Sequence, residues 1–212
     1  MAIARGIASA PAPPYNGRVK ALLLACLIGT SPAPELVDVA VLVPDAVLDL
    51  RYASSQNLAG RAIYPVARCL LLRPVAARLA AAAARLRDEG YRLVLWDCYR
   101  PASAHAALWR AHPHPGSVAD PARGSHHSRG AAVDVSLAAP DGTPALMPTD
   151  HDAFGPKSRA DATGGVPPVA QKNRDLLRAA LEAEGFAVNP REWWHFAWRG
   201  AARLPVLDEP LR

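Results

Sequence analysis

The chain has 212 residues, of which 50% are hydrophobic and 20% are charged. This composition is typical of one globular domain of ordinary size, and it supplies enough apolar surface for a core that needs no metal or disulfide merely to fold. The formal net charge is +5, but the arginines are scattered and form no Lys/Arg block. We therefore expect no nucleic-acid partner.

Residues 1–36 form an N-terminal extension with the order of a secretory signal. A basic stretch at 18–20 precedes an apolar run at 21–28, and small and Pro residues follow. The run is too short to span a bilayer, so we expect no transmembrane span in the mature protein. We expect an exported, periplasmic protein whose signal starts at Val19. Lipidation at Cys26 is an alternative, and the protein would be cytoplasmic if the run is a buried strand or helix.

The three cysteines match no zinc-binding spacing and no CxxC redox motif. Cys26 lies in the apolar run, which leaves Cys69 and Cys98 as a candidate disulfide pair. Such a bond would indicate an oxidising compartment.

Beyond the extension, residues 37–212 are predicted to form a single domain. Alternating apolar and polar residues predict strands, and apolar residues three or four apart predict helices, the two longer ones ending at Gly90 and Gly185. The expected elements are one or two strands in 37–53 near Pro44, a helix over 73–89, a strand over 91–98, a short helix through 106–111, a loop at 112–124, a strand over 131–137, a long loop at 138–167, a helix over 169–184 and a strand over 192–198. No regular βαβ repeat occurs, so an α+β fold is favoured over a doubly wound sheet.

Two segments concentrate histidines and acidic residues, 125–134 (SHHSRGAAVD) and 192–196 (EWWHF). A catalytic zinc needs three protein ligands and one open position. Candidate ligands are His127, Asp134 and His195, and Asp134 falls on the less apolar face of its predicted strand. Neutral imidazole and carboxylate groups suit Zn²⁺ and leave it able to acidify water.

The carboxylate base that peptide hydrolysis requires can be Glu192. Glu192 and His195 are three residues apart, and such residues point to opposite faces of a regular strand. Both can reach one metal only if Glu192 lies on a bend, so we predict a turn or bulge near residues 189–191, where Pro190 favours it. Of Trp193 and Trp194, we expect one in the core and one in a pocket wall.

The other histidines have ordinary interpretations. His126 competes with His127 as a ligand, and spacing alone does not choose between them. A surface position or a simple hydrogen-bonded role is expected for His105, His112, His114 and His151.

Taken together, these motifs resemble those of the VanX-type D-alanyl-D-alanine dipeptidases, within the zinc D,D-peptidase superfamily that shares a fold with the Hedgehog signalling domain. The resemblance covers approximately residues 37–200. The matching residues are Ser125, His127 and Asp134 for Ser-x-His-x6-Asp, Glu192 to His195 for Glu-x-x-His with both tryptophans, Asp97 to Pro101 for Asp-x-Tyr-Arg-Pro and, more weakly, residues 51–53 and 57–60.

The resemblance implies a small, mostly antiparallel sheet with flanking helices and one Zn²⁺ per chain. It implies zinc ligands at His127, Asp134 and His195, in preference to His126. The other implied roles are Glu192 as general base and then acid, Arg100 as the cation that stabilises the oxyanion, and substrate contacts at Ser125, Asp152, Trp193 and Trp194. Exported relatives often carry cysteines at the positions of Cys69 and Cys98, which supports their pairing.

The implied activity is hydrolysis of D-Ala-D-Ala, a small D,D-dipeptide, in peptidoglycan metabolism. One segment departs from the family: Met-Gly-Thr-x-Phe-Asp-x-Phe reads here as residues 147–154, with Pro148 in place of Gly and His151 in place of Phe. Because this loop walls the family's pocket, the departure bears on substrate preference. The alternative is a D,D-carboxypeptidase or endopeptidase that acts on stem peptides. A non-catalytic module is disfavoured because Glu192 and Arg100 are both present, and the oligomeric state is left open.

Overall fold

The computed structural model of the protein describes residues 35–113 and 116–212. The expected signal segment, with its basic and apolar stretches and Cys26, lies outside these residues, as does His114. No helix within the two described ranges has the length and apolar content that a membrane span requires.

A five-stranded sheet carries the residues of interest, with the strand order β2-β4-β5-β7-β6. Its strands are β2 (Val47–Leu48), β4 (Arg92–Asp97), β5 (Ala132–Ala138), β6 (Phe186–Asn189) and β7 (Glu192–Trp198). Only the pairing of β2 with β4 is parallel, and the other three pairings are antiparallel. A separate antiparallel pair joins β1 (Leu36–Asp38) to β3 (Leu70–Leu72). The predicted α+β class with a mostly antiparallel sheet is confirmed.

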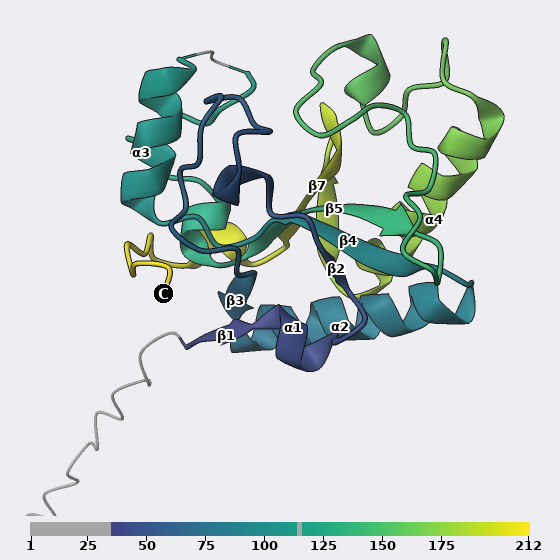
Figure 1. Ribbon diagram of the computed structural model, residues 1–212, viewed down its shortest axis with the longest axis horizontal. Helices are drawn as coiled ribbons and strands as arrows, with labels where there is room; N and C mark the ends of the chain where they lie inside the picture. The colour runs from purple at the N-terminus through teal and green to yellow at the C-terminus, as the bar shows by residue number, and fades with distance from the viewer. Residues whose placement is uncertain (1–34, 114–115) are drawn as a thin grey trace, which may run out of the picture. The chain divides into compact units, whose positions relative to one another are not determined.

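Two long helices, α2 (Arg73–Asp88) and α4 (Pro168–Ala183), pack against the sheet and against each other. Each has a proline in its first turn, a position that tolerates the missing N–H. Apolar side chains at helical spacing are fully buried, and these are Val75, Leu79 and Leu86 on α2 and Leu177 and Leu181 on α4. Helix α3 (Ala102–Ala111) follows β4 and stands apart from this pair (Figure 1).

The region predicted as one or two strands is more broken than expected. After β1 the chain turns into α1 (Val39–Leu42), because the Asp38 side chain accepts a hydrogen bond from the Ala40 amide at 3.0 Å and caps the helix. Strand β2 then has only two residues. The structure also contains β3 and β6, which were not predicted because three or four residues show too little alternation.

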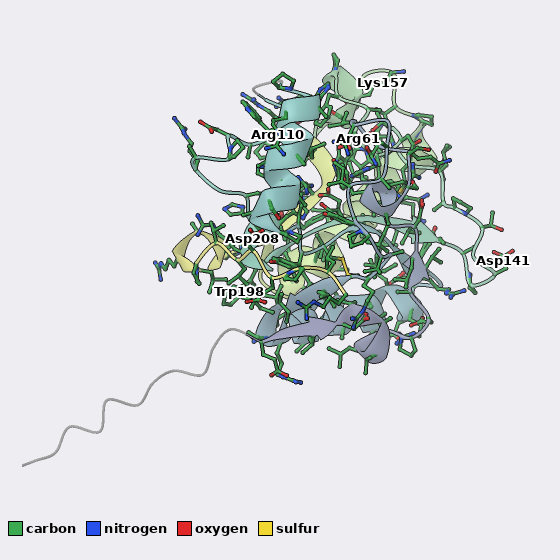
Figure 2. All side chains as sticks on the ribbon, turned by 60° about the vertical axis from the view of Figure 1, so that its left-hand side comes forward. Arg61, Arg110, Asp141, Lys157, Trp198 and Asp208 are labelled. Atoms are coloured by element: carbon green, nitrogen blue, oxygen red, sulfur yellow. A yellow bond between two sulfur atoms is a disulfide. The ribbon has the colours of Figure 1, made fainter. Side chains whose placement is uncertain are left out.

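The Cys69–Cys98 disulfide is present, with 5.2 Å between the two Cα atoms, and is drawn in yellow in Figure 2. Cys69 directly precedes β3, and Cys98 directly follows β4. The Tyr99 amide also donates to the Leu70 carbonyl at 2.9 Å. The end of β4 is therefore fixed to the smaller sheet.

The C-terminal segment supports the same end of the sheet. Its Leu207 amide donates to the Ser128 carbonyl at 2.7 Å, and its Asp208 side chain (labelled in Figure 2) accepts from the Ser103 amide at 2.8 Å. These contacts hold the turn before β5 and the start of α3 in place.

Candidate metal centre and active site

Strand register brings the predicted ligands together. Asp134 on β5 is paired with His195 on β7, and directly opposed residues on neighbouring strands point to the same face. A register shift in β4 places Asp97 opposite Asp134 on its other side. His127 arrives from the single-turn 3-10 helix His127–Arg129, which ends at Gly130 with φ +62° before β5 begins.

The three donor atoms form a tight triangle. His127 Nε2 lies 3.0 Å from His195 Nδ1 and 3.3 Å from Asp134 Oδ1, and His195 Nδ1 lies 2.9 Å from Asp134 Oδ1. Ligand atoms around a tetrahedral zinc ion are about 3.3 Å apart, so the triangle has nearly the size of a zinc site. Within the described part of the chain, no other three His, Cys, Asp or Glu residues meet in this way.

Hydrogen bonds define the state of these ligands. His127 Nδ1 lies 2.8 Å from the Cys98 carbonyl oxygen, which can only accept, so Nδ1 carries a proton and Nε2 is the ring atom that faces the triangle. Burial alone would raise the pKa of the Asp134 carboxyl. The charge of His127 and hydrogen bonds from the neighbouring histidines outweigh burial and hold that pKa well below its usual value. Asp134 is therefore an ionised carboxylate, as a metal ligand must be.

The predicted bend before β7 is confirmed. Residues 190–191 form the turn between β6 and β7, and the register shifts between Val188 and Asn189, so that Asn189 is paired with Glu192. Glu192 Oε2 thereby comes within 4.0 Å of His195 Nδ1. Burial raises the pKa of the Glu192 carboxyl above its ordinary value, against the opposing effect of His195. A carboxyl group with a raised pKa beside the ligand triangle is suited to exchange protons.

Arg100 is held on three sides. Its Nε donates to Asp97 Oδ2 at 3.0 Å, its Nη1 lies 3.2 Å from His105 Nδ1, and its guanidinium stacks over the Tyr52 ring at 4.6 Å. Burial alone would lower the pKa of Arg100, but the charge of Asp97 keeps it well above its ordinary value. The site thus contains a permanently charged, fixed donor.

The ligand triangle opens onto a cavity of about 220 Å³. Its lining includes the three candidate ligands together with Glu192 and Arg100. Two further predicted residues, Ser125 and Asp152, also line it. The arrangement joins a metal-ligand set, a carboxyl base and a cation around a space of the size of a small ligand.

Comparison with known proteins identifies this arrangement. Residues 32–210 match the family described as D-Ala-D-Ala dipeptidase. The chain belongs to the D-Ala-D-Ala dipeptidase family. It is similar to the D-alanyl-D-alanine dipeptidase of Escherichia coli K12, with 42% identity over 179 residues that cover 84% of this chain and 92% of the relative.

Two other members of this family differ more in sequence. The D-alanyl-D-alanine dipeptidase of Streptomyces coelicolor is 35% identical over 169 residues, which cover 70% of this chain and 83% of the relative. That of Enterococcus faecalis is 30% identical over 183 residues, which cover 76% of this chain and 86% of the relative. Membership of the D-Ala-D-Ala dipeptidase family makes the chain a hydrolase of the peptidase class.

The positions of the two tryptophans differ from the sequence-based expectation, which placed one of them in the pocket wall and implied substrate contacts for both. Trp193 is 0% exposed and Trp194 is 1% exposed, and neither lines the cavity. Trp193 Nε1 donates to Thr149 Oγ1 at 2.9 Å, and the Trp194 ring packs edge-on against Phe154. Both tryptophans therefore belong to the packed support of the site, and neither forms part of the pocket wall.

Several polar residues around the site were missed or underestimated in the sequence. His105 and His151 were expected to have ordinary roles, but both are buried beside site residues. Tyr52 donates to Asp152 Oδ2 at 2.8 Å and also lines the cavity. In the sequence, only the weak resemblance of residues 51–53 to the family indicated a role for Tyr52. The exposed His126 lies at the cavity as well, but it is not a member of the ligand triangle.

Proposed function

We propose that the protein is a zinc-dependent dipeptidase that hydrolyses D-Ala-D-Ala to D-alanine. The observation that carries this proposal is the triangle of donor atoms from His127, Asp134 and His195, with the Glu192 carboxylate 4.0 Å from one corner. The activity named for the similar proteins supports the choice of substrate.

One zinc ion would be held by His127, Asp134 and His195. Two imidazoles and one carboxylate are a donor set that suits Zn²⁺ and leaves one position open for catalysis. A bound zinc ion supplies Lewis-acid chemistry, which acidifies water and polarises a carbonyl group.

Glu192 moves the proton in this proposal. As a carboxylate it takes a proton from the attacking water, and as a carboxylic acid it gives that proton to the leaving amine. Its burial supports both roles, since a raised pKa brings the two protonation states closer in free energy near neutral pH.

Arg100 stabilises the charge that develops on the carbonyl oxygen. Its position is fixed before substrate binds, because Asp97 and His105 occupy part of its donor set. A preorganised donor of this kind can contribute about 3–4 kcal/mol of transition-state stabilisation.

The cavity also supports a preference for a short substrate. Asp152 places a carboxylate at the wall, where it can bind a free ammonium group, and Ser125 offers a hydroxyl elsewhere in the lining. A cavity of about 220 Å³ is of the size of a dipeptide, which supports a short substrate. D-Ala-D-Ala is a building unit of peptidoglycan, so we place the enzyme in cell-wall metabolism.

We also propose that the enzyme is exported, with the periplasm as its compartment. The signal-like order of residues 1–36 and the Cys69–Cys98 bond both support export, because disulfides persist in oxidising compartments.

The decisive experiment compares free D-Ala-D-Ala, L-Ala-L-Ala and a pentapeptide stem as substrates of the wild-type protein and of Glu192→Gln. We expect hydrolysis of D-Ala-D-Ala alone, loss of activity on chelation and its return with Zn²⁺. Glu192→Gln should bind one zinc per chain and lose roughly 10²–10⁴-fold in kcat. Full activity without metal would refute the zinc mechanism. Faster cleavage of the stem peptide would favour a D,D-carboxypeptidase.

A further inference from the structure

His151 occupies an unusual place in the molecule. Its side chain is 1% exposed and sits in a box of aromatic rings, with ring centroids 5.2 Å from Trp96 and 5.9 Å from both Tyr52 and Trp194. An apolar ring would satisfy these packing contacts. The imidazole must therefore be explained by what its nitrogen atoms touch.

The two oxygens of Asp134 have different partners. Oδ1 faces His127 Nε2 and His195 Nδ1 in the ligand triangle, whereas Oδ2 lies 3.2 Å from His151 Nε2. An ionised carboxylate only accepts hydrogen bonds, so Nε2 of His151 is the donor. Oδ1 of Asp134 thus faces the proposed metal position, and Oδ2 accepts the hydrogen bond from His151.

We propose that His151 is a positioning residue of the metal centre, which fixes Asp134 as a ligand through Oδ1 alone. This inference rests on the proposed zinc centre. A carboxylate free to rotate could bind an ion through both oxygens and occupy the position that catalysis needs open. Hydrogen bonds to ligating groups restrict such rotation, and their loss typically weakens metal affinity roughly 10–100-fold.

The structure also explains why a histidine serves here. It combines the flat ring that the Trp96 and Trp194 contacts require with a donor at the ring edge that reaches Asp134. Because the family motif has Phe at this position, we infer that this chain uses the same packing site and adds a hydrogen bond to the ligand.

Two substitutions separate the hydrogen bond from the packing. His151→Phe keeps a ring of similar size and removes the donor. His151→Gln removes the ring but can place an amide N–H near the position of Nε2. Zinc affinity of the full chain is measured by competition with a chromophoric chelator, and the thermal unfolding of each metal-free protein reports packing.

We expect His151→Phe to bind Zn²⁺ roughly 10–100-fold more weakly than wild type, and His151→Gln to stay within about threefold. A role in packing alone gives the reverse order, with Gln the weaker binder, and would overturn the inference. So would equal zinc affinity of the Phe variant and wild type. If the Phe variant does not fold, the Gln variant decides, since a tenfold loss in folded Gln protein contradicts a donor role. A wild-type chain that takes up no zinc would overturn the proposed zinc centre itself. A wild-type chain that binds zinc, with variants that behave against expectation, would overturn only the role of His151.

Discussion

Reduction of the Cys69–Cys98 bond should destabilise the protein strongly, because the bond closes a long loop. The two cysteines are 29 residues apart in the sequence. In the chain-entropy description, a loop of this length restricts the unfolded chain enough to contribute about 3.6 kcal/mol at 25 °C. For a domain of this size, that corresponds to a fall in Tm of roughly 7–14 °C.

The cleanest perturbation is reduction of the wild-type protein, which opens the loop without creating a cavity. Thermal unfolding is followed with and without a phosphine reductant, and thiols are titrated in denaturant to verify the state of each sample. Before reduction, neither Cys69 nor Cys98 should react. Cys69→Ala serves as a matched control because it leaves Cys98 unbridged, and it should lose at least as much stability as the reduced protein.

A reduced protein in which Cys69 and Cys98 both react and whose Tm is within about 2 °C of that of the oxidised protein would contradict this reasoning. Such a result would mean that residual contacts around residues 98–101 restrict the unfolded chain even without the bond. The bond would then remove less conformational entropy from the unfolded chain than the calculation assumes.

Three further predictions concern single residues. Gly130→Ala should destabilise the fold by about 1–3 kcal/mol in urea unfolding, because φ is +62° and the added Cβ would lie 2.9 Å from Leu36 Cδ2; an unchanged midpoint would show that Leu36 moves away freely. Arg100→Lys should lower kcat on D-Ala-D-Ala by roughly 10²–10³-fold with zinc content unchanged, since an ammonium group cannot replace the fork that Asp97 fixes; a small kcat effect with raised KM would assign Arg100 to substrate binding. Burial and the charge of Arg100 lower the pKa of His105 from 6.5 to about 4. Between these two pH values His105 is protonated in the unfolded chain but not in the folded chain, so the free energy of unfolding decreases as the pH falls through this window. Wild type should lose about 2 kcal/mol more than His105→Gln between pH 7 and pH 4.5, and parallel losses would refute the assignment.

The larger elements of the fold could be predicted because their patterns are long. The helix over 73–89 and the strand over 192–198 each show several repeats of their period, and the structure contains them almost unchanged. By contrast, β3 depends on β1, a partner that is distant in sequence, and β6 has only four residues, too few to show a period of their own. Likewise, α1 arises from a local cap at Asp38 within an apolar run that resembles a strand.

The residues of the ligand triangle could be proposed from the sequence, but the choice between His126 and His127 required a resemblance to known proteins. The structure shows the physical reason for the choice. His127 is turned inward and tied to the Cys98 carbonyl, whereas His126 is exposed. No local pattern encodes this difference, because Cys98 lies 29 residues earlier in the chain.

The role of His151 could not be predicted for a similar reason. It belongs to a long loop without periodicity, and its contact with Asp134 crosses from this loop to a strand. The sequence shows only that the family's Phe has been replaced.

The segment from Asp97 to Arg100 explains why a covalent bond belongs at this point of the fold. The Asp97 carboxylate accepts from Arg100, and the Cys98 carbonyl accepts from the metal-facing His127. A shift of this segment would therefore move the Arg100 guanidinium and also break the hydrogen bond that holds the His127 imidazole. Beyond Asp97, which ends β4, single backbone hydrogen bonds from the Tyr99 amide to Leu70 and from the Arg100 amide to His127 hold the segment, without the continuous ladder that restrains a helix or strand. The bond from Cys98 to Cys69 supplies that restraint, and it joins the stability of the domain to the geometry of its active site.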